Sequence, residues 1–142
     1  MRLEPAEAEV LALDAAAFAR ALPDAAARAR YERLAAAAAS GTLPAELVGA
    51  LETMLGLLFE KGRPSNRAIL QSVFGKTPRG RQRNAAARDV TKALSALRGQ
   101  QLESLRLSAA PSGHTLVLET DRVRLTLEID ADGARVASLE TG

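Results

Sequence analysis

The sequence contains no cysteine, no tryptophan and a single histidine, His114. The lack of cysteine excludes disulfides, thiolate metal sites and cysteine redox chemistry within the chain. With one histidine, neither a nucleophile triad nor a histidine metal cluster can be assembled in one copy. We therefore expect no catalytic residue, no metal site, no cofactor and no enzymatic activity.

Aromatic residues are also scarce, at three Phe and one Tyr, whereas 30 of the 142 residues are alanine. The core must therefore be built from Leu and Val packed against small side chains, which favours closely packed helices. No apolar run approaches the roughly 20 residues that span a bilayer, and the first residues lack the basic-then-apolar pattern of a signal peptide. We expect a cytoplasmic protein that makes no membrane contact.

The net charge of +2 hides an uneven distribution of charge along the chain. Residues 1–60 carry five basic and nine acidic side chains, and residues 99–142 carry four and seven. Residues 61–98 carry ten basic side chains against Asp89 alone. Solvated surfaces normally mix the two signs, so a segment this one-sided predicts a positive face whose partner is a polyanion.

The first forty residues predict two alanine-rich helices. Pro5 and Glu7 open the first helix, and the second runs from Pro23 and Asp24 to Gly41. Helices this rich in alanine bury little apolar area. We therefore expect the hairpin to pack on the rest of the chain or on a second copy.

Two further helices are predicted before the most basic part of the chain. Pro44 opens a helix with a continuous apolar stripe that ends at Gly62. Ser65 is a suitable N-cap for a short helix that Gly75 closes. Residues 76–80 are then predicted to form a turn that contains glycine and proline. This turn is longer than the compact turn found between the helices of a helix-turn-helix.

The helix expected after this turn, capped by Thr77 and ending at Gly99, has two different walls. At 100° per residue its apolar side chains cluster on one side: Ala86, Ala87, Val90, Ala93, Leu94 and Leu97. Its polar side chains cluster on the opposite side: Arg81, Asn84, Arg88, Lys92 and Ser95. Arg79 and Arg83 project onto the apolar side, so we expect that end of the helix to protrude from the body of the protein.

An Arg, Lys and Asn wall opposite an apolar wall suits a helix that enters the DNA major groove. Arg pairs with guanine acceptors, Asn with adenine, and Lys with phosphates. The preceding helix would cross the DNA backbone, where Arg67, with Arg63 before it and Lys76 in the turn, is expected to contact phosphates.

From Leu102 onward the apolar period changes from helical to alternating. The pattern predicts strands around Leu105 and Leu107, at 115–119, at 122–130 and from Val136 to Leu139, with hairpin turns at 111–113 and at Asp132 and Gly133. The predicted fold class is α+β, mainly α. It comprises an N-terminal helical hairpin (1–41) and a winged-helix-like helix-turn-helix that continues into a small antiparallel meander (44–142).

Helix 44–61, the short helix to Gly75, the basic helix and the hairpin 102–119 together resemble the winged helix-turn-helix superfamily. The resemblance implies duplex DNA binding, with the basic helix as the recognition helix and the turn from Pro111 to His114 as the wing. It extends to the level of the superfamily and to no specific family within it. The meander continues for two strands beyond a simple wing.

The sequence therefore predicts a non-enzymatic DNA-binding protein, either a regulator or a nucleoid- or repair-associated factor. The predicted contacts are Arg63, Arg67, Lys76, Arg79, Arg81, Arg83, Asn84, Arg88 and Lys92. A homodimer is compatible with this interpretation, because many such proteins place two basic helices one DNA turn apart. The alternative hypotheses are RNA contact and a protein-interaction adaptor. The adaptor would dock through the basic face, the acidic meander or the N-terminal helices.

Overall fold

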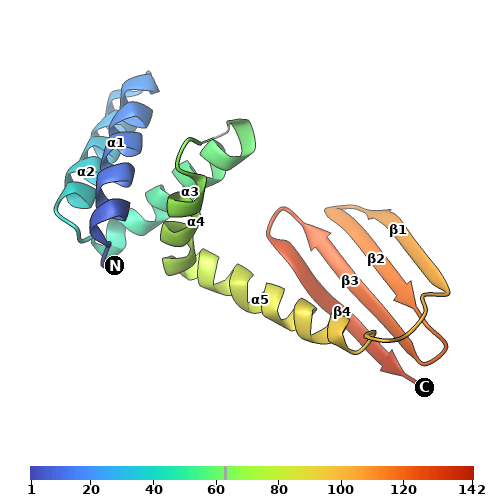
Figure 1. Cartoon of the computed structure of the whole chain (residues 1–142). Coiled ribbons are helices and arrows are strands. Elements are labelled where there is room, and N and C mark those ends of the chain that lie inside the picture. Colours follow the sequence, from blue (N-terminus) through green and yellow to red (C-terminus); the bar gives the residue numbers. More distant parts are fainter. Residues whose placement is uncertain (63) are drawn as a thin grey trace. The chain divides into compact units, whose positions relative to one another are not determined.

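The computed structural model describes residues 1–62 and 64–142, and within them five helices are followed by a four-stranded antiparallel sheet (Figure 1). The predicted fold class, α+β and mainly α with a C-terminal meander, is confirmed. The chain divides into two compact units, Met1–Gly80 (unit 1) and Arg81–Gly142 (unit 2).

Unit 1 begins with a helical hairpin of α1 (Pro5–Ala21) and α2 (Ala25–Ala39), whose helices run side by side (Figure 1). The Asp24 carboxylate accepts a hydrogen bond from the Ala27 N–H and caps α2. Alanine on both helices permits the helices to approach each other closely. The rings of Phe18 and Tyr31 pack edge to face, with their centroids 4.7 Å apart. The two-helix prediction for residues 1–41 is confirmed.

The other two helices of unit 1, α3 (Ala45–Lys61) and α4 (Arg67–Lys76), complete its core. The apolar stripe of α3 is buried with Leu70 and Val73 of α4, as the periodicity predicts. The prediction of Ser65 as N-cap is wrong, because Asn66 occupies that position and Ser65 lies in the turn before it. Likewise α4 runs one residue past Gly75 and ends at Lys76.

The corner between α4 and α5 (Pro78–Ser95) is tighter than the sequence suggests, since only Thr77 separates the two helices. The Thr77 hydroxyl donates to the Phe74 carbonyl at 2.7 Å and accepts from the Gly80 N–H at 3.0 Å. A Cβ on Gly80 would stand 1.8 Å from the Phe74 carbonyl oxygen. The prediction that Thr77 caps the following helix is therefore confirmed. The predicted five-residue turn is wrong, because four of its residues belong to the two helices. Position 80 requires glycine, because any larger side chain would overlap the Phe74 carbonyl.

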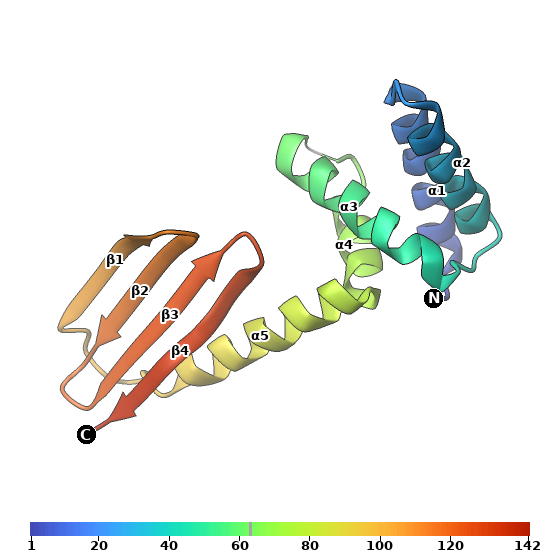
Figure 2. The same ribbon diagram turned by 180° about the vertical axis from the view of Figure 1, so that it is seen from behind.

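Unit 2 contains α5 from Arg81 onward and the sheet of β1 (Ser104–Ala110), β2 (Gly113–Glu119), β3 (Val123–Asp130) and β4 (Gly133–Thr141). The strands pair in chain order, so β1 and β4 are the two edges (Figure 2). All four strands were predicted from alternation. The turn predicted at Asp132 and Gly133 lies one residue earlier: Ala131 and Asp132 form it, and Gly133 is the first residue of β4. Gly133 has the expected positive φ of 117°, which favours glycine, but Asp132 does not have a positive φ.

One face of this sheet is apolar and α5 packs on it. The strand register forms two leucine-rich rows across the sheet: Leu105, Leu118, Leu125 and Leu139, then Leu107, Leu116, Leu127 and Val136. The helix contributes Ala93, with Val90 and Leu97, to a core with the β2 and β3 members of these rows and Val136 of β4, whereas Leu139 stays 42% exposed. The helix ends at Ser95 rather than at the predicted Gly99, and residues 96–99 form turns.

Candidate nucleic-acid interface

Four polar residues of α5 form a continuous exposed surface, which we call the cationic wall: Arg81, Asn84, Arg88 and Lys92. They lie on one side of the helix because, at 100° per residue, residues 7 or 11 apart return to nearly the same angle and residues 3 or 4 apart lie on neighbouring turns of the same side. The opposite side holds the buried Ala93 and the half-buried Val90 and Leu97. The two-walled helix expected from the sequence is therefore present.

The apolar wall is narrower than the sequence predicts. Ala87 is exposed and Leu94 retains 39% exposure, although both fall on the expected apolar side. The sheet contacts the sector around Val90 and Ala93 and leaves the flank of the helix open. The cationic wall is unaffected, because it lies on the side of α5 away from this contact.

The cations of the wall differ from the arginines of the sheet in their ion pairing. Each arginine on β1, β3 and β4 and in the β2–β3 turn lies within 4 Å of a carboxylate. In the part of the chain that the structure describes, Arg81, Arg88 and Lys92 make no ion pair and no side-chain hydrogen bond. The wall therefore presents positive charge that its own chain does not neutralise.

Part of this charge pattern works against the stability of α5 itself. The first turn of the helix contains no acidic residue, although the positive end of the helix dipole favours carboxylates there. Arg88 and Lys92 stand four residues apart, a like-charge spacing that costs about 0.2–0.5 kcal/mol. Lys92, by contrast, lies in the last turn, where the negative end of the helix dipole favours a cation.

Arg79 and Arg83, the other two predicted DNA contacts near the start of α5, make contacts within the protein. Arg83 reaches over the β3–β4 turn, where its guanidinium donates to the Ala131 carbonyl and lies 3.8 Å from the Asp132 carboxylate. Arg79 is half-buried, and its backbone N–H faces the Glu52 carboxylate at 3.4 Å. The prediction that this end of the helix protrudes is wrong for Arg83, because the turn supplies it with acceptors.

The predicted phosphate contacts of the preceding segment belong to unit 1. The Lys76 ammonium lies 2.6 Å from the Glu7 carboxylate, which is 5% exposed and also accepts from the Ser72 hydroxyl and the Glu4 N–H. The guanidinium of exposed Arg67 stacks on the Phe59 ring, with its carbon 4.8 Å from the ring centroid.

Burial acts to raise the pKa of the Glu7 carboxyl. The hydrogen bonds from Lys76, Glu4 and Ser72 outweigh this effect and hold the pKa below its ordinary value. Glu7 thus stays ionised and ties Lys76 to α1. Arg63, the remaining predicted contact, lies outside the described residues.

The hairpin predicted as a wing is short. Pro111 and Ser112 form the turn between β1 and β2, and exposed His114 already belongs to β2. His114 stands between Ala109 and Ile129 on the apolar face of the sheet. Among the described residues no group of three or more His, Cys, Asp or Glu could hold a metal ion.

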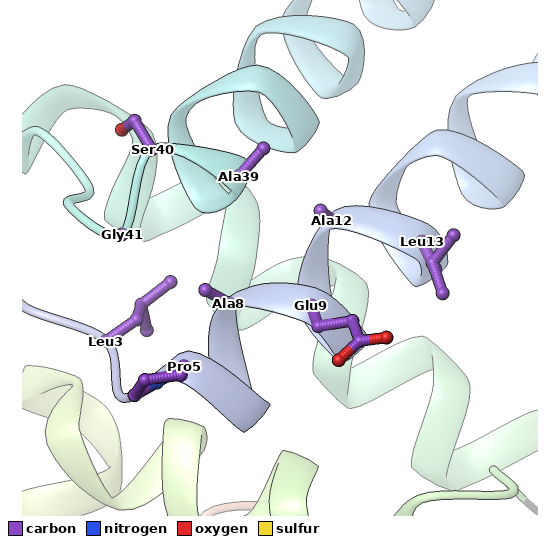
Figure 3. A pocket seen from close by; sticks show the side chains of 9 residues that line it. All are labelled: Leu3, Pro5, Ala8, Glu9, Ala12, Leu13, Ala39, Ser40 and Gly41. Atoms are coloured by element: carbon purple, nitrogen blue, oxygen red, sulfur yellow. The ribbon is translucent and has the colours of Figure 1, made fainter.

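A depression of about 600 Å³ lies on unit 1 between α1 and the end of α2 (Figure 3). The side chains of Ala8, Ala12 and Ala39 line it, and Glu9 is the charged residue among those around it (Figure 3). A mostly apolar, open depression with one carboxylate offers no set of convergent groups for catalysis. The cationic wall therefore remains the best candidate site.

Comparisons of the chain with protein-family models, with curated proteins and with solved structures find no match. No helix in the described part of the chain is long and apolar enough to cross a bilayer. The geometry and charge of the described residues are therefore the grounds on which a function is assigned.

Proposed function

We propose that this protein binds duplex DNA without catalysing a reaction, and that the cationic wall of α5 is the contacting surface. The observation that carries the proposal is the contrast between this wall and the sheet. The described arginines of the sheet are paired with carboxylates, whereas Arg81, Arg88 and Lys92 are exposed and have no such partner in the described chain.

The dimensions of the wall match a major groove. From Arg81 to Lys92 the helix rises about 16 Å, at about 1.5 Å per residue. That length covers about five base pairs at about 3.4 Å each. A helix fits the groove width of about 12 Å, where Arg can contact guanine and Asn can contact adenine.

Asn84 strengthens the case for duplex DNA over a purely electrostatic surface. It is exposed and lies one turn from Arg81 and from Arg88. A side-chain amide can donate to and accept from an adenine edge, whereas it contributes no charge toward phosphates. The wall thus combines groups for phosphate contact with a group for base contact.

The adaptor hypothesis receives less support from the meander. The carboxylates of Glu119, Glu128 and Asp130 lie within 4 Å of arginines of the same sheet. Paired charges of this kind attract a charged partner weakly. We therefore favour the wall over the sheet as the recognition surface.

The winged-helix relationship expected from the order of α4, α5 and the β1–β2 hairpin stays a prediction. We also propose the cytoplasmic location expected from the sequence, which requires that the DNA lies in the same compartment.

A fluorescence anisotropy titration with one labelled sequence as duplex DNA, single-stranded DNA and duplex RNA tests the proposal. Arg88→Glu should weaken duplex DNA binding at least tenfold, and Arg20→Glu is the matched control because it makes the same charge change on exposed α1. Equal loss in both variants would indicate net charge rather than a site. If the protein binds duplex RNA or single-stranded DNA more tightly than duplex DNA, that nucleic acid is the ligand and the proposal of duplex DNA is wrong.

A further inference from the structure

Strand β1 is an edge of the sheet whose backbone and side chains are both uncovered. Its neighbour on one side is β2, and none of the described strands pairs with its other side. Leu105 and Leu107 belong to the apolar face, yet they are 60% and 63% exposed because α5 packs on the β2 and β3 parts of that face and on Val136 of β4. Figures 1 and 2 show β1 as the strand farthest from α5. The sheet therefore presents an apolar strip beside unpaired N–H and C=O groups.

The opposite edge is better protected against pairing. The register of β4 on β3 shifts between Thr126 and Leu127, which marks a bulge or irregularity, and the strand carries Arg135 and Glu140. Strand β1 pairs with β2 without a shift, contains no proline, and has Arg106 as its charged residue. Bulges, prolines and charges are the usual devices that block edge pairing, so β1 is the open edge.

We propose that β1 pairs antiparallel with β1 of a second copy, about a twofold axis at Leu107, to give a continuous eight-stranded sheet. Leu107 is the middle residue of the seven in β1. Pairing about this residue therefore matches all seven positions. It places Leu107 opposite itself, Leu105 opposite Ala109, and Arg106 opposite Ser108.

The charges of the molecule favour this register and this partner. Moving the axis to Arg106 would set two arginines directly opposite each other, which is unfavourable, and would pair only five residues of the strand. In the register at Leu107, no like charges face each other across the new pair. Residues 81–142 carry nine basic and eight acidic side chains, so two copies of unit 2 meet with little net repulsion.

This inference stands apart from the proposed function, because the edge and its leucines do not include any residue of the cationic wall. A seven-residue pairing edge is small, so we expect a reversible dimer with a dissociation constant near the micromolar range. The concentration of the chain then decides how much of it is paired.

The absence of cysteine allows a test that reports the register. In the full chain Leu107→Cys should form a disulfide-linked dimer on mild oxidation, because residues directly opposite lie about 4.5–5.5 Å apart at Cα. Leu105→Cys is the matched control: two copies of residue 105 would lie about 14 Å apart, four residues along the paired strands. An equimolar mixture of Leu105→Cys and Ala109→Cys chains should cross-link again.

The expected result is cross-linking of Leu107→Cys at least ten times faster than of Leu105→Cys. Equal rates, or no dimer from Leu107→Cys, would overturn the proposal. Sedimentation equilibrium gives a second measurement: the unmodified chain should associate, and Leu107→Lys should weaken association at least tenfold while leaving the circular dichroism spectrum unchanged. An unmodified chain that stays monomeric at hundreds of micromolar would also overturn the proposal, and would leave the edge to a strand of a different protein.

Discussion

Glu7 and Lys76 are 69 residues apart in the sequence, and their side chains meet at 2.6 Å in the core-facing contact between α1 and α4. The pair removes one cation from the basic segment that attracts attention in the sequence. It also gives that cation a structural task, because Glu7 holds Ser72 and Lys76 of α4 together. The positive surface is accordingly smaller than a count of basic residues suggests.

Replacing Glu7 by Gln should destabilise the chain at neutral pH by about 1–3 kcal/mol, because Lys76 loses its charged acceptor. The pKa of Glu7 is lowered in the folded state. Its contribution is therefore fully present above its unfolded pKa of about 4.3 and is lost as the pH falls through the folded pKa. Urea unfolding of both chains between pH 3 and 7 should show their stabilities converging toward the acid end. A difference independent of pH would contradict an ionised Glu7.

Gly80→Ala should destabilise unit 1 by about 1–3 kcal/mol, because the new methyl group would overlap the Phe74 carbonyl. Gly56→Ala is the matched control: Gly56 lies within α3 and a Cβ there meets nothing within 4 Å. That substitution should stabilise the helix by about 0.5–1 kcal/mol. Thermal unfolding measures both effects: Gly80→Ala should lower Tm and Gly56→Ala should raise it. Similar shifts in Tm for the two variants would contradict the close contact between Gly80 and Phe74.

Arg83→Ala should loosen the β3–β4 turn rather than abolish DNA binding, because the guanidinium is bound to Ala131 and Asp132. Amide hydrogen exchange at residues 131–133 should accelerate severalfold. Affinity for duplex DNA should change less than for Arg88→Ala, which removes an exposed cation of the same charge. If Arg83→Ala lowers the affinity for duplex DNA more than Arg88→Ala does, Arg83 contacts the DNA and this interpretation is wrong.

Lys92→Gln should change the salt dependence of DNA binding. Each phosphate contact contributes about −0.9 to the slope of log affinity against log salt concentration, so loss of one contact should make the slope shallower by about 0.9 per bound copy. Titrations between 50 and 200 mM salt measure this difference. An unchanged slope would mean that Lys92 contacts no phosphate.

Periodicity was sufficient to predict the elements and the two walls of α5. Side chains at 100° intervals placed Arg88 and Lys92 opposite Val90, and alternation placed Leu125 and Leu127 on the buried face of β3. Both patterns depend on local geometry alone. They hold because each element buries one face, whichever partner covers it.

Contacts between distant parts of the sequence were not predictable in this way. Glu7 has the appearance of a helix-start residue, and nothing near it in the sequence indicates Lys76. The exposure of Leu107 depends on which strands α5 covers, and alternation gives each strand the same apolar face. The tightness of the corner at Thr77 depends on the close approach of Gly80 to Phe74, which only the folded chain reveals.

The most direct test of the account is a map of the DNA-contacting residues by NMR, with the ¹⁵N-labelled chain titrated with a short duplex. We predict that the largest shift changes fall on the exposed side of α5, at Arg81, Asn84, Arg88 and Lys92, and that unit 1 shifts little. Changes centred instead on α1 and α2 or on the polar face of the sheet, or no changes at a saturating duplex concentration, would contradict it.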